Sequence, residues 1–280
     1  MELLYVENLC KNYDKFKLDN VSFSLEKGYI MGFIGRNGAG KTTTLKSMLN
    51  LVHKDGGTVR IAGEDFDRSE LFCKSKLGVV FGDVDYYHKK RVKSITDVVR
   101  RFYSEWDDAA YERYLKRFQI DSDKRIDQLS RGMKVKYQLA LALSHNARLL
   151  LLDEPTSGLD PVSRDDILEV FQEIIEDGEH SIFFSTHITS DLEKCADYIT
   201  YIKDGKIAAS QEKDAFLNEY SEVKGTKAQL TGVLKNRLIG LKENSFGFSA
   251  LMKTSDISRE DNLQIFPADI ETIMIHFERD

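Results

Sequence analysis

The run Gly35-Arg36-Asn37-Gly38-Ala39-Gly40-Lys41-Thr42, followed by Thr43, has the spacing G-x-x-x-x-G-K-T and decides how this chain is interpreted. A bound phosphate needs several backbone N–H groups that converge on its oxygens, and residues without a Cβ allow the closest approach. Lys41 is placed to reach the β- and γ-phosphates of a nucleotide, and the Thr42 hydroxyl can ligate Mg²⁺. The run therefore predicts a nucleoside triphosphate site, and a glycine-rich turn that matches by chance is the alternative.

The flanking sequence agrees with this interpretation. Residues 29–34 (Tyr-Ile-Met-Gly-Phe-Ile) have the apolar character of a buried strand. Leu45, Met48, Leu49 and Val52 give the segment after the loop one apolar helical face. The N-terminal end of such a helix points its positive dipole at a bound anion.

The composition bounds the class of protein. The chain has 280 residues, 41% hydrophobic and 31% charged, which predicts a globular protein with one large domain and a smaller one. No apolar run approaches the roughly 18 residues that span a bilayer, and the first residues lack a signal peptide's features. The three cysteines, Cys10, Cys73 and Cys195, indicate neither a disulfide framework nor a zinc site. The net charge of −6 argues against broad nucleic-acid binding. We expect a cytoplasmic chain that acts at a membrane only through a partner.

Strands and helices alternate along most of the chain. Predicted strands lie at residues 3–6, 21–25, 56–63, 77–81, 149–152 and 181–185, and a helix runs from Pro161 to about residue 177. Ile95, Val98, Val99, Phe102, Tyr103 and Trp106 have the spacing of one amphipathic helix, and Tyr111, Leu115 and Phe118 that of a second. This pattern predicts an α/β fold with a helical insertion. Residues 222–280 read as a small second domain that closes with a helix starting at Pro267.

A second motif combines an apolar strand with two carboxylates. Residues 149–152 are four leucines, and Asp153 and Glu154 follow them directly. Asp153 can hold the magnesium that Thr42 also ligates, while Glu154 can orient and deprotonate an attacking water. Acidic residues also cap strands commonly, but the upstream phosphate loop favours the catalytic interpretation.

Two further segments complete a family pattern. Leu129-Ser130-Arg131-Gly132-Met133 precedes the acidic strand, which continues as Pro155-Thr156-Ser157-Gly158-Leu159-Asp160-Pro161, and Ser185-Thr186-His187 comes later. This ordered set resembles the ATP-binding-cassette (ABC) ATPases over about residues 1–218. The resemblance implies a P-loop NTPase core of the ABC type, with an antiparallel β subdomain and a helical subdomain at about 88–135. A small C-terminal α+β domain at 222–280 would follow it.

The resemblance also implies roles for individual residues. Residues 129–133 look like the signature segment, which would bring the Ser130 hydroxyl and the Gly132 N–H to the ATP of a partner subunit in a head-to-tail dimer. Asp160 resembles the residue that links the two sites, and His187 resembles the histidine that contacts the γ-phosphate. Tyr13 matches the position of the aromatic residue that stacks on adenine.

The sequence departs from the family pattern in two places, the signature segment and the position of a glutamine that contacts magnesium. Arg131 and Met133 replace the usual third and fifth signature residues, whereas Ser130 and Gly132 are kept. After residues 77–81 the family places a glutamine that contacts magnesium, and this chain has Gly82-Asp83 instead. Asp83 could substitute as an oxygen ligand, or the contact is absent. In the family the segment that follows forms a groove for the membrane subunit, and the adjacent Tyr86 and Tyr87 suit either that interface or half-buried loop packing.

These features predict an ATPase that uses ATP and Mg²⁺ to power export through a separate membrane permease. The signature variant resembles ABC-2-type exporters of antibiotics and peptides, such as the phenol-soluble-modulin exporter. The expected partners are a second ATPase subunit, as in a homodimer, and the permease, which would hold the chain at the inner face of the cell membrane; no nucleic acid is expected. The alternatives are a non-transport ABC ATPase that acts on ribosomes or DNA, and an importer ATPase.

Overall fold

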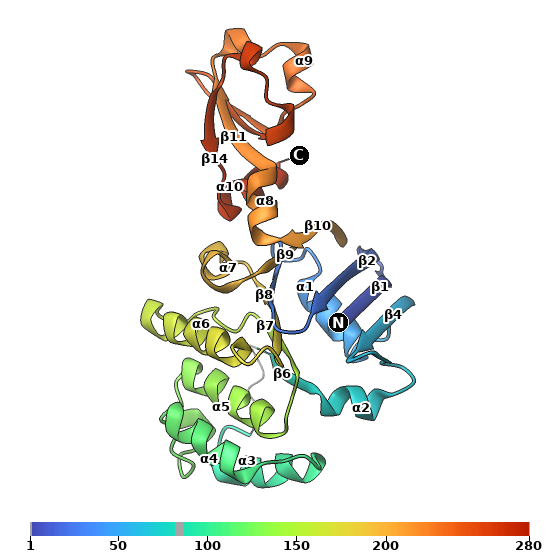
Figure 1. Cartoon of the computed structure of the whole chain (residues 1–280), viewed down its shortest axis with the longest axis vertical. Coiled ribbons are helices and arrows are strands. Elements are labelled where there is room, and N and C mark those ends of the chain that lie inside the picture. The colour runs from blue at the N-terminus through green and yellow to red at the C-terminus, as the bar shows by residue number, and fades with distance from the viewer. Residues whose placement is uncertain (1, 82–86, 280) are drawn as a thin grey trace. The chain divides into compact units, whose positions relative to one another are not determined.

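The computed structural model describes residues 2–81 and 87–279 and divides the chain into two compact units, residues 1–210 and 211–280 (Figure 1). We expected the first domain to extend to residue 218. The helix α8 (Lys213–Glu219) belongs instead to the second unit, whose strand β11 (Tyr220–Gly225) follows it without a break. Within the described residues, no helix combines the length and the apolar character needed to cross a membrane.

The first unit contains two sheets and a set of helices. Its strands are β1 (Glu2–Tyr13), β2 (Phe16–Glu26), β3 (Ile30–Ile34), β4 (Gly56–Ile61), β5 (Glu64–Asp65), β6 (Leu77–Phe81), β7 (Leu149–Asp153), β8 (Ser181–Thr186), β9 (Tyr198–Lys203) and β10 (Lys206–Glu212), the last of which crosses the boundary between the units. Its helices are α1 (Lys41–Met48), α2 (Glu70–Ser75), α3 (Val92–Val99), α4 (Asp108–Arg117), α5 (Arg131–Ser144), α6 (Pro161–Ile175) and α7 (Thr189–Cys195), with 3₁₀ turns at Arg100–Phe102 and Ile126–Gln128. The strands predicted from the sequence are confirmed.

The central sheet brings the two main motifs to one edge. Its strand order is β10-β9-β3-β8-β7-β6, and β3 pairs in parallel with β8 and β9, as β7 does with β6 and β8. Every residue of β7 and of β3 is buried, which fits parallel strands covered on both faces. Since the carboxyl ends of parallel strands share one edge, the loops after β3, β7 and β8 meet there.

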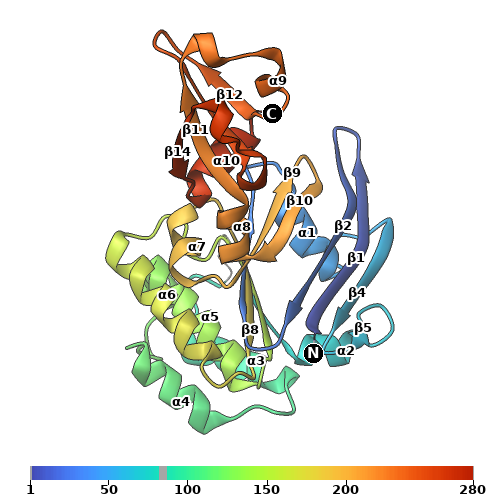
Figure 2. The same cartoon turned by 45° about the horizontal axis from the view of Figure 1, so that its top comes forward.

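The antiparallel sheet and α1 cover one face of the central sheet (Figure 2). The antiparallel order is β2-β1-β4-β5. Phe23 of β2 stacks on Phe183 of β8 with ring centroids 5.2 Å apart, and Phe33 of β3 lies 5.7 Å from Phe23. Buried aromatic pairs of this kind stabilise beyond the area they remove from water. This layer therefore fixes the strand that carries the phosphate loop.

Helices α5, α6 and α7 cover the opposite face. A Cβ on Gly78 of β6 would lie 2.4 Å from the Ala142 methyl group of α5, and one on Gly32 of β3 would lie 1.9 Å from Leu192 of α7. Such contacts are possible only because glycine has no side chain there. The helix predicted to begin at Pro161 is confirmed as α6, with Asp160 accepting hydrogen bonds from two N–H groups of its first turn.

The first helix of the helical insertion is shorter than its apolar spacing predicts. It ends at Val99, and after one 3₁₀ turn the backbone at Tyr103 is extended. Tyr103 stacks on the buried His145 at the end of α5, and this contact redirects the chain before Trp106. Phe102, which the prediction placed on a buried face, is 80% exposed. The second helix is confirmed as α4, with Asp107 capping it and Tyr111 and Leu115 buried.

Acid should destabilise the protein through His145. Burial lowers the pKa of His145 to about 4, from 6.5 in the unfolded chain. The unfolded chain therefore binds a proton that the folded chain excludes, and the stability present above pH 6.5 is lost as the pH falls towards 4. By linkage the loss at pH 5 is about 2 kcal/mol. Thermal unfolding of His145→Gln should show a smaller drop between pH 7.5 and pH 5 than the wild type. Equal drops would contradict this assignment.

The second unit is a four-stranded antiparallel sheet with short helices. Its elements after β11 are α9 (Gly232–Lys235), β12 (Ile239–Glu243), β13 (Phe248–Lys253), β14 (Gln264–Pro267) and α10 (Ile270–Phe277), with 3₁₀ turns at Lys227–Gln229, Thr254–Asp256 and Arg259–Asp261. The sheet order is β12-β13-β11-β14. The final helix starts at Ile270 and not at Pro267, because Pro267 pairs with Ser221 at the end of β14 and Asp269 caps the helix.

Candidate functional site

The phosphate loop connects β3 to α1 and is closely packed from behind. A Cβ on Gly35 would lie 2.3 Å from the Ile202 carbonyl oxygen, so no other residue fits that position. Gly40, which precedes α1, has a φ of 116°, a value that L side chains rarely adopt. The buried Ala39 receives the N–H of Gly205 on its carbonyl oxygen. The phosphate loop is thus held rigidly at the N-terminal end of α1, where bound anions are favoured.

Lys41 is the first residue of α1, and its side chain turns back towards the phosphate loop. Its ammonium donates to the carbonyl oxygen of Gly35 at 2.7 Å and to that of Arg36 at 3.4 Å. It also lies 3.5 Å from Oε1 of Glu154, and its side chain is only 6% exposed. A buried cation with this set of oxygen partners is held in place without rotamer freedom, which positions it for a phosphate bound by the loop.

Asp153 and Thr42 form the donor set expected for magnesium. Oδ2 of Asp153 accepts the Thr42 hydroxyl at 2.9 Å, and its Oδ1 accepts the Ser185 hydroxyl at 2.5 Å. The two residues are far apart in sequence and meet because β7 and the loop after β3 end at the same sheet edge. A carboxylate beside a hydroxyl is the oxygen-only environment that Mg²⁺ prefers. The residues therefore fit a bound magnesium.

Glu154 is held in a strained backbone conformation. Its φ is 51°, which is uncommon for a residue other than glycine. The Glu154 N–H reaches the Ser185 carbonyl and hydroxyl oxygens, both at 3.1 Å, and these contacts stabilise the turn. Oε2 of Glu154 lies 2.7 Å from Nδ1 of His187. The strain turns Glu154 towards Lys41 and His187, and residues of this kind cluster at functional sites.

A buried pair that the sequence analysis missed supports Glu154 and His187 from behind. The Thr156 hydroxyl donates to Oδ2 of Asp191 at 2.6 Å, and both residues are essentially inaccessible to solvent. Burial raises the pKa of the Asp191 carboxyl, despite Arg164 at 3.9 Å. This bond ties the loop that follows Glu154 to α7, which follows His187. The two catalytic candidates are thereby linked through their own backbone segments.

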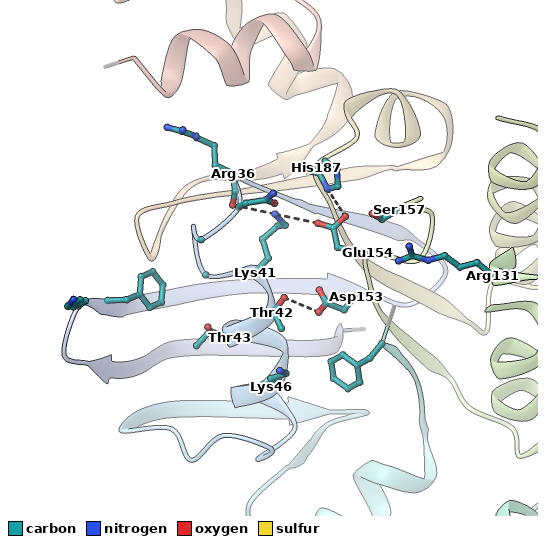
Figure 3. A pocket seen from close by; sticks show the side chains of 16 residues that line it. Arg36, Lys41, Thr42, Thr43, Lys46, Arg131, Asp153, Glu154, Ser157 and His187 are labelled. Carbon is teal, nitrogen blue, oxygen red and sulfur yellow. Dashed lines mark hydrogen bonds and ion pairs between the residues drawn. The ribbon is translucent and has the colours of Figure 1, made fainter. Parts of the chain in front are cut away.

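Lys41, the Thr42–Asp153 pair, Glu154 and His187 line one cavity of about 1010 Å³ (Figure 3). Of the predicted site residues, those that line it are Asn37, Gly38, Gly40, Lys41, Thr42, Thr43, Asp153, Glu154 and His187. The sequence analysis did not assign the other lining residues, which are Lys15, Phe16, Arg36, Lys46, Phe81, Arg131 and Ser157. The described lining contains five Lys and Arg side chains against two carboxylates. This excess of positive charge suits a triphosphate.

The signature residues Ser130 and Gly132 face a different cavity. Ser130 caps α5 and accepts the N–H of Met133 at 3.2 Å. Ser130 and Gly132 line a second cavity of about 420 Å³, and neither is among the described residues that line the first. Asp160 caps α6, and the hydrogen bond from Ser163, a residue of the second cavity, lowers the pKa of Asp160. The structure thus places Ser130 and Gly132 in a cavity that the described residues of the same chain's phosphate loop do not line.

Tyr13, Gly35, Ala39 and Asp160 are not among the described residues that line either cavity. Tyr13 ends β1 and is 48% exposed, and Phe16, its partner across the hairpin, lines the first cavity. The Lys11 ammonium lies 5.5 Å from the centroid of the Tyr13 ring. Asp83, proposed as a magnesium ligand, and Tyr86 lie outside the described residues, whereas Tyr87 is exposed. Phe16 begins β2, and a Cβ on Gly40 would lie 2.8 Å from its ring, so this aromatic side chain packs against the phosphate loop.

Known proteins share this arrangement of motifs. The family model for ABC transporters matches residues 18–157. The lantibiotic transport ATP-binding protein SrtF of Streptococcus pyogenes is 33% identical over 218 residues, which cover 77% of this chain and 93% of that protein. The Nod factor export ATP-binding protein I of Burkholderia orbicola (strain AU 1054) is 33% identical over 75% of this chain and 71% of its own length. A solved ATP-binding subunit of an ABC transporter superposes with a TM-score of 0.68 at 26% identity, over 76% of this chain and 91% of the other.

The chain belongs to the ABC transporter ATP-binding family. It is an ATP-binding, ATP-hydrolysing subunit of that class, as its cavity and its motifs predicted. The expected fold, an ABC-type P-loop core with an antiparallel and a helical subdomain, is likewise confirmed.

Proposed function

We propose that this chain hydrolyses MgATP and uses the energy to power export through a separate membrane permease. The observation that carries the proposal is the convergence of Lys41, Glu154 and His187 on one cavity, beside the Thr42–Asp153 pair. Lys41 binds the β- and γ-phosphates, and Glu154 accepts the proton of the attacking water. His187 keeps Glu154 oriented and contacts the γ-phosphate.

Magnesium belongs to the proposal through Thr42 and Asp153. Their hydroxyl and carboxylate oxygens lie 2.9 Å apart and would hold the ion beside the phosphates. The bound ion would neutralise charge on the β- and γ-phosphates. Asp83 is proposed as a further oxygen ligand, and Tyr13 as the surface on which adenine stacks.

A head-to-tail dimer follows from the separation of the two cavities. Ser130 and Gly132 lie at the N-terminal end of α5, where the helix dipole favours a phosphate. They line the second cavity, and no described residue of the phosphate loop lines that cavity. A second subunit would bring its own loop to them. Two ATP molecules would then lie between the subunits, and the expected pairing is a homodimer. Residues 222–280 are proposed to be a small accessory domain.

The relatives support transport out of the cell. One is named for lantibiotic transport and another for Nod factor export, so an antibiotic or an amphipathic peptide is the proposed class of cargo. The chain would sit at the inner face of the cell membrane, held there by the permease. The relatives are named for transport, which disfavours a ribosome- or DNA-directed ATPase, and the relative named for Nod factor export favours export over import.

Purification from native membranes tests this proposal directly. The tagged full-length chain, extracted in mild detergent, should carry a stoichiometric permease with several membrane spans that mass spectrometry identifies. The Lys41→Ala chain, purified in the same way, is the matched control. It shows whether the chain binds the permease without bound nucleotide. Recovery with ribosomes or DNA-bound proteins, and without a permease, would contradict the transport proposal and leave the ATPase assignment intact.

A further inference from the structure

Three consecutive residues of the signature face two different cavities. Ser130 and Gly132 line the smaller cavity, whereas Arg131 between them lines the larger one together with Lys41, Glu154 and His187. Arg131 is the first residue of α5, so its side chain leaves the helix at the end that abuts the phosphate loop's cavity. Of the two signature residues that depart from the family pattern, Met133 lines the smaller cavity and Arg131 lines the chain's own nucleotide site.

The Arg131 side chain runs past a glycine. A Cβ on Gly158 would lie 2.5 Å from Nη1 at the mobile end of Arg131, so the guanidinium packs against the loop that follows Glu154. Gly158 also has a φ of 69°, which favours glycine. Figure 3 shows Arg131 extending from the helices towards Ser157 and Glu154. The guanidinium thus enters the cavity beside the loop that follows the catalytic carboxylate.

Arg131 shares this cavity with the groups expected to meet the end of a nucleotide. Lys41 lies 3.5 Å from Glu154 and Glu154 lies 2.7 Å from His187, so a terminal phosphate held by the loop would lie beside these three groups. Phe16 and Lys15 line the cavity elsewhere and come from the β-hairpin. A guanidinium suits this end, because its planar fork can donate two hydrogen bonds to one phosphate.

We propose that Arg131 binds the terminal phosphate of ATP held by the phosphate loop of its own chain. This inference rests on the proposed function and adds a contact within one subunit to the contacts expected between subunits. Arg131 begins the helix that carries Ser130 and Gly132, so ATP in one cavity also positions the residues that the other cavity presents. ADP lacks the group that Arg131 binds and cannot do this.

Nucleotide binding by the single subunit tests the proposal. The full-length chain is titrated calorimetrically with Mg-AMP-PNP, a non-hydrolysable ATP analogue, and with Mg-ADP, at concentrations where sedimentation shows one chain. Loss of a charge-assisted hydrogen bond predicts that Arg131→Gln raises the Kd for the ATP analogue about tenfold. The Kd for ADP should change less than about twofold. Arg131→Lys should recover part of the difference, because it keeps the charge.

Lys134→Gln is the matched control. It removes one positive charge from the same helix, and Lys134 is not among the described residues that line either cavity. Three outcomes would overturn the proposal. The Kd could change equally in Arg131→Gln and Lys134→Gln, it could change equally for both nucleotides, or it could change only in the dimer. If Lys41→Ala also leaves both nucleotides bound as in the wild type, the proposed function fails as well, which distinguishes the two failures.

Discussion

Glu154→Gln is expected to lower the ATPase rate about 100- to 10,000-fold while MgATP still binds, since a general base contributes about this much to a rate. The amide has nearly the shape of the carboxylate, so the contacts of Lys41 with the Gly35 and Arg36 carbonyls remain. The positive φ of residue 154 is maintained by Ser185 through its backbone and hydroxyl, which the substitution does not alter. Binding should therefore be separated from turnover.

Phosphate release at saturating ATP and size exclusion with ATP and Mg²⁺ measure the two effects. The variant should elute as a stable dimer that holds two nucleotides, because closure proceeds and hydrolysis does not. Glu271→Gln, an exposed carboxylate of the second unit, is the matched control and should behave as the wild type. Turnover by Glu154→Gln near the wild-type rate would show that another group accepts the proton.

Lys41→Ala is expected to weaken nucleotide binding and hydrolysis together. The ammonium is the most buried positive charge of the cavity lining, and its loss removes about 1.5–3 kcal/mol for a charge-assisted hydrogen bond to phosphate. This corresponds to an ATP affinity about 10- to 100-fold lower. Turnover at saturating ATP should fall further, because the same charge stabilises the transition state.

A fluorescent ATP analogue and a phosphate-release assay test both parts on one preparation. Lys74→Ala, which removes an exposed lysine paired with Glu70 on α2, controls for the loss of one positive charge. Unchanged affinity in the Lys41 variant would mean that the loop binds no phosphate. Lower affinity with an unchanged maximal rate would mean that Lys41 stabilises bound substrate and transition state equally.

The sequence determined the features that depend on local spacing. Three such features follow from a few adjacent residues, and the structure has them where they were predicted. They are the glycine-rich loop at residues 35–40, the buried run before Asp153 and the start of a helix at Asp160-Pro161. The strand order places Thr42 beside Asp153. The alternation of strands and helices, together with the phosphate-loop motif, was enough to predict this contact. The family also followed from the order of the motifs.

Only the tertiary structure decided the features that depend on contacts between distant segments. The first insertion helix stops at Val99 because Tyr103 stacks on His145, and spacing alone cannot show a partner some forty positions away. The Thr156–Asp191 bond and the turn of Arg131 into its own cavity have the same origin. A residue's neighbours along the chain set its local conformation, but burial and charge at a site are set by groups that folding brings together.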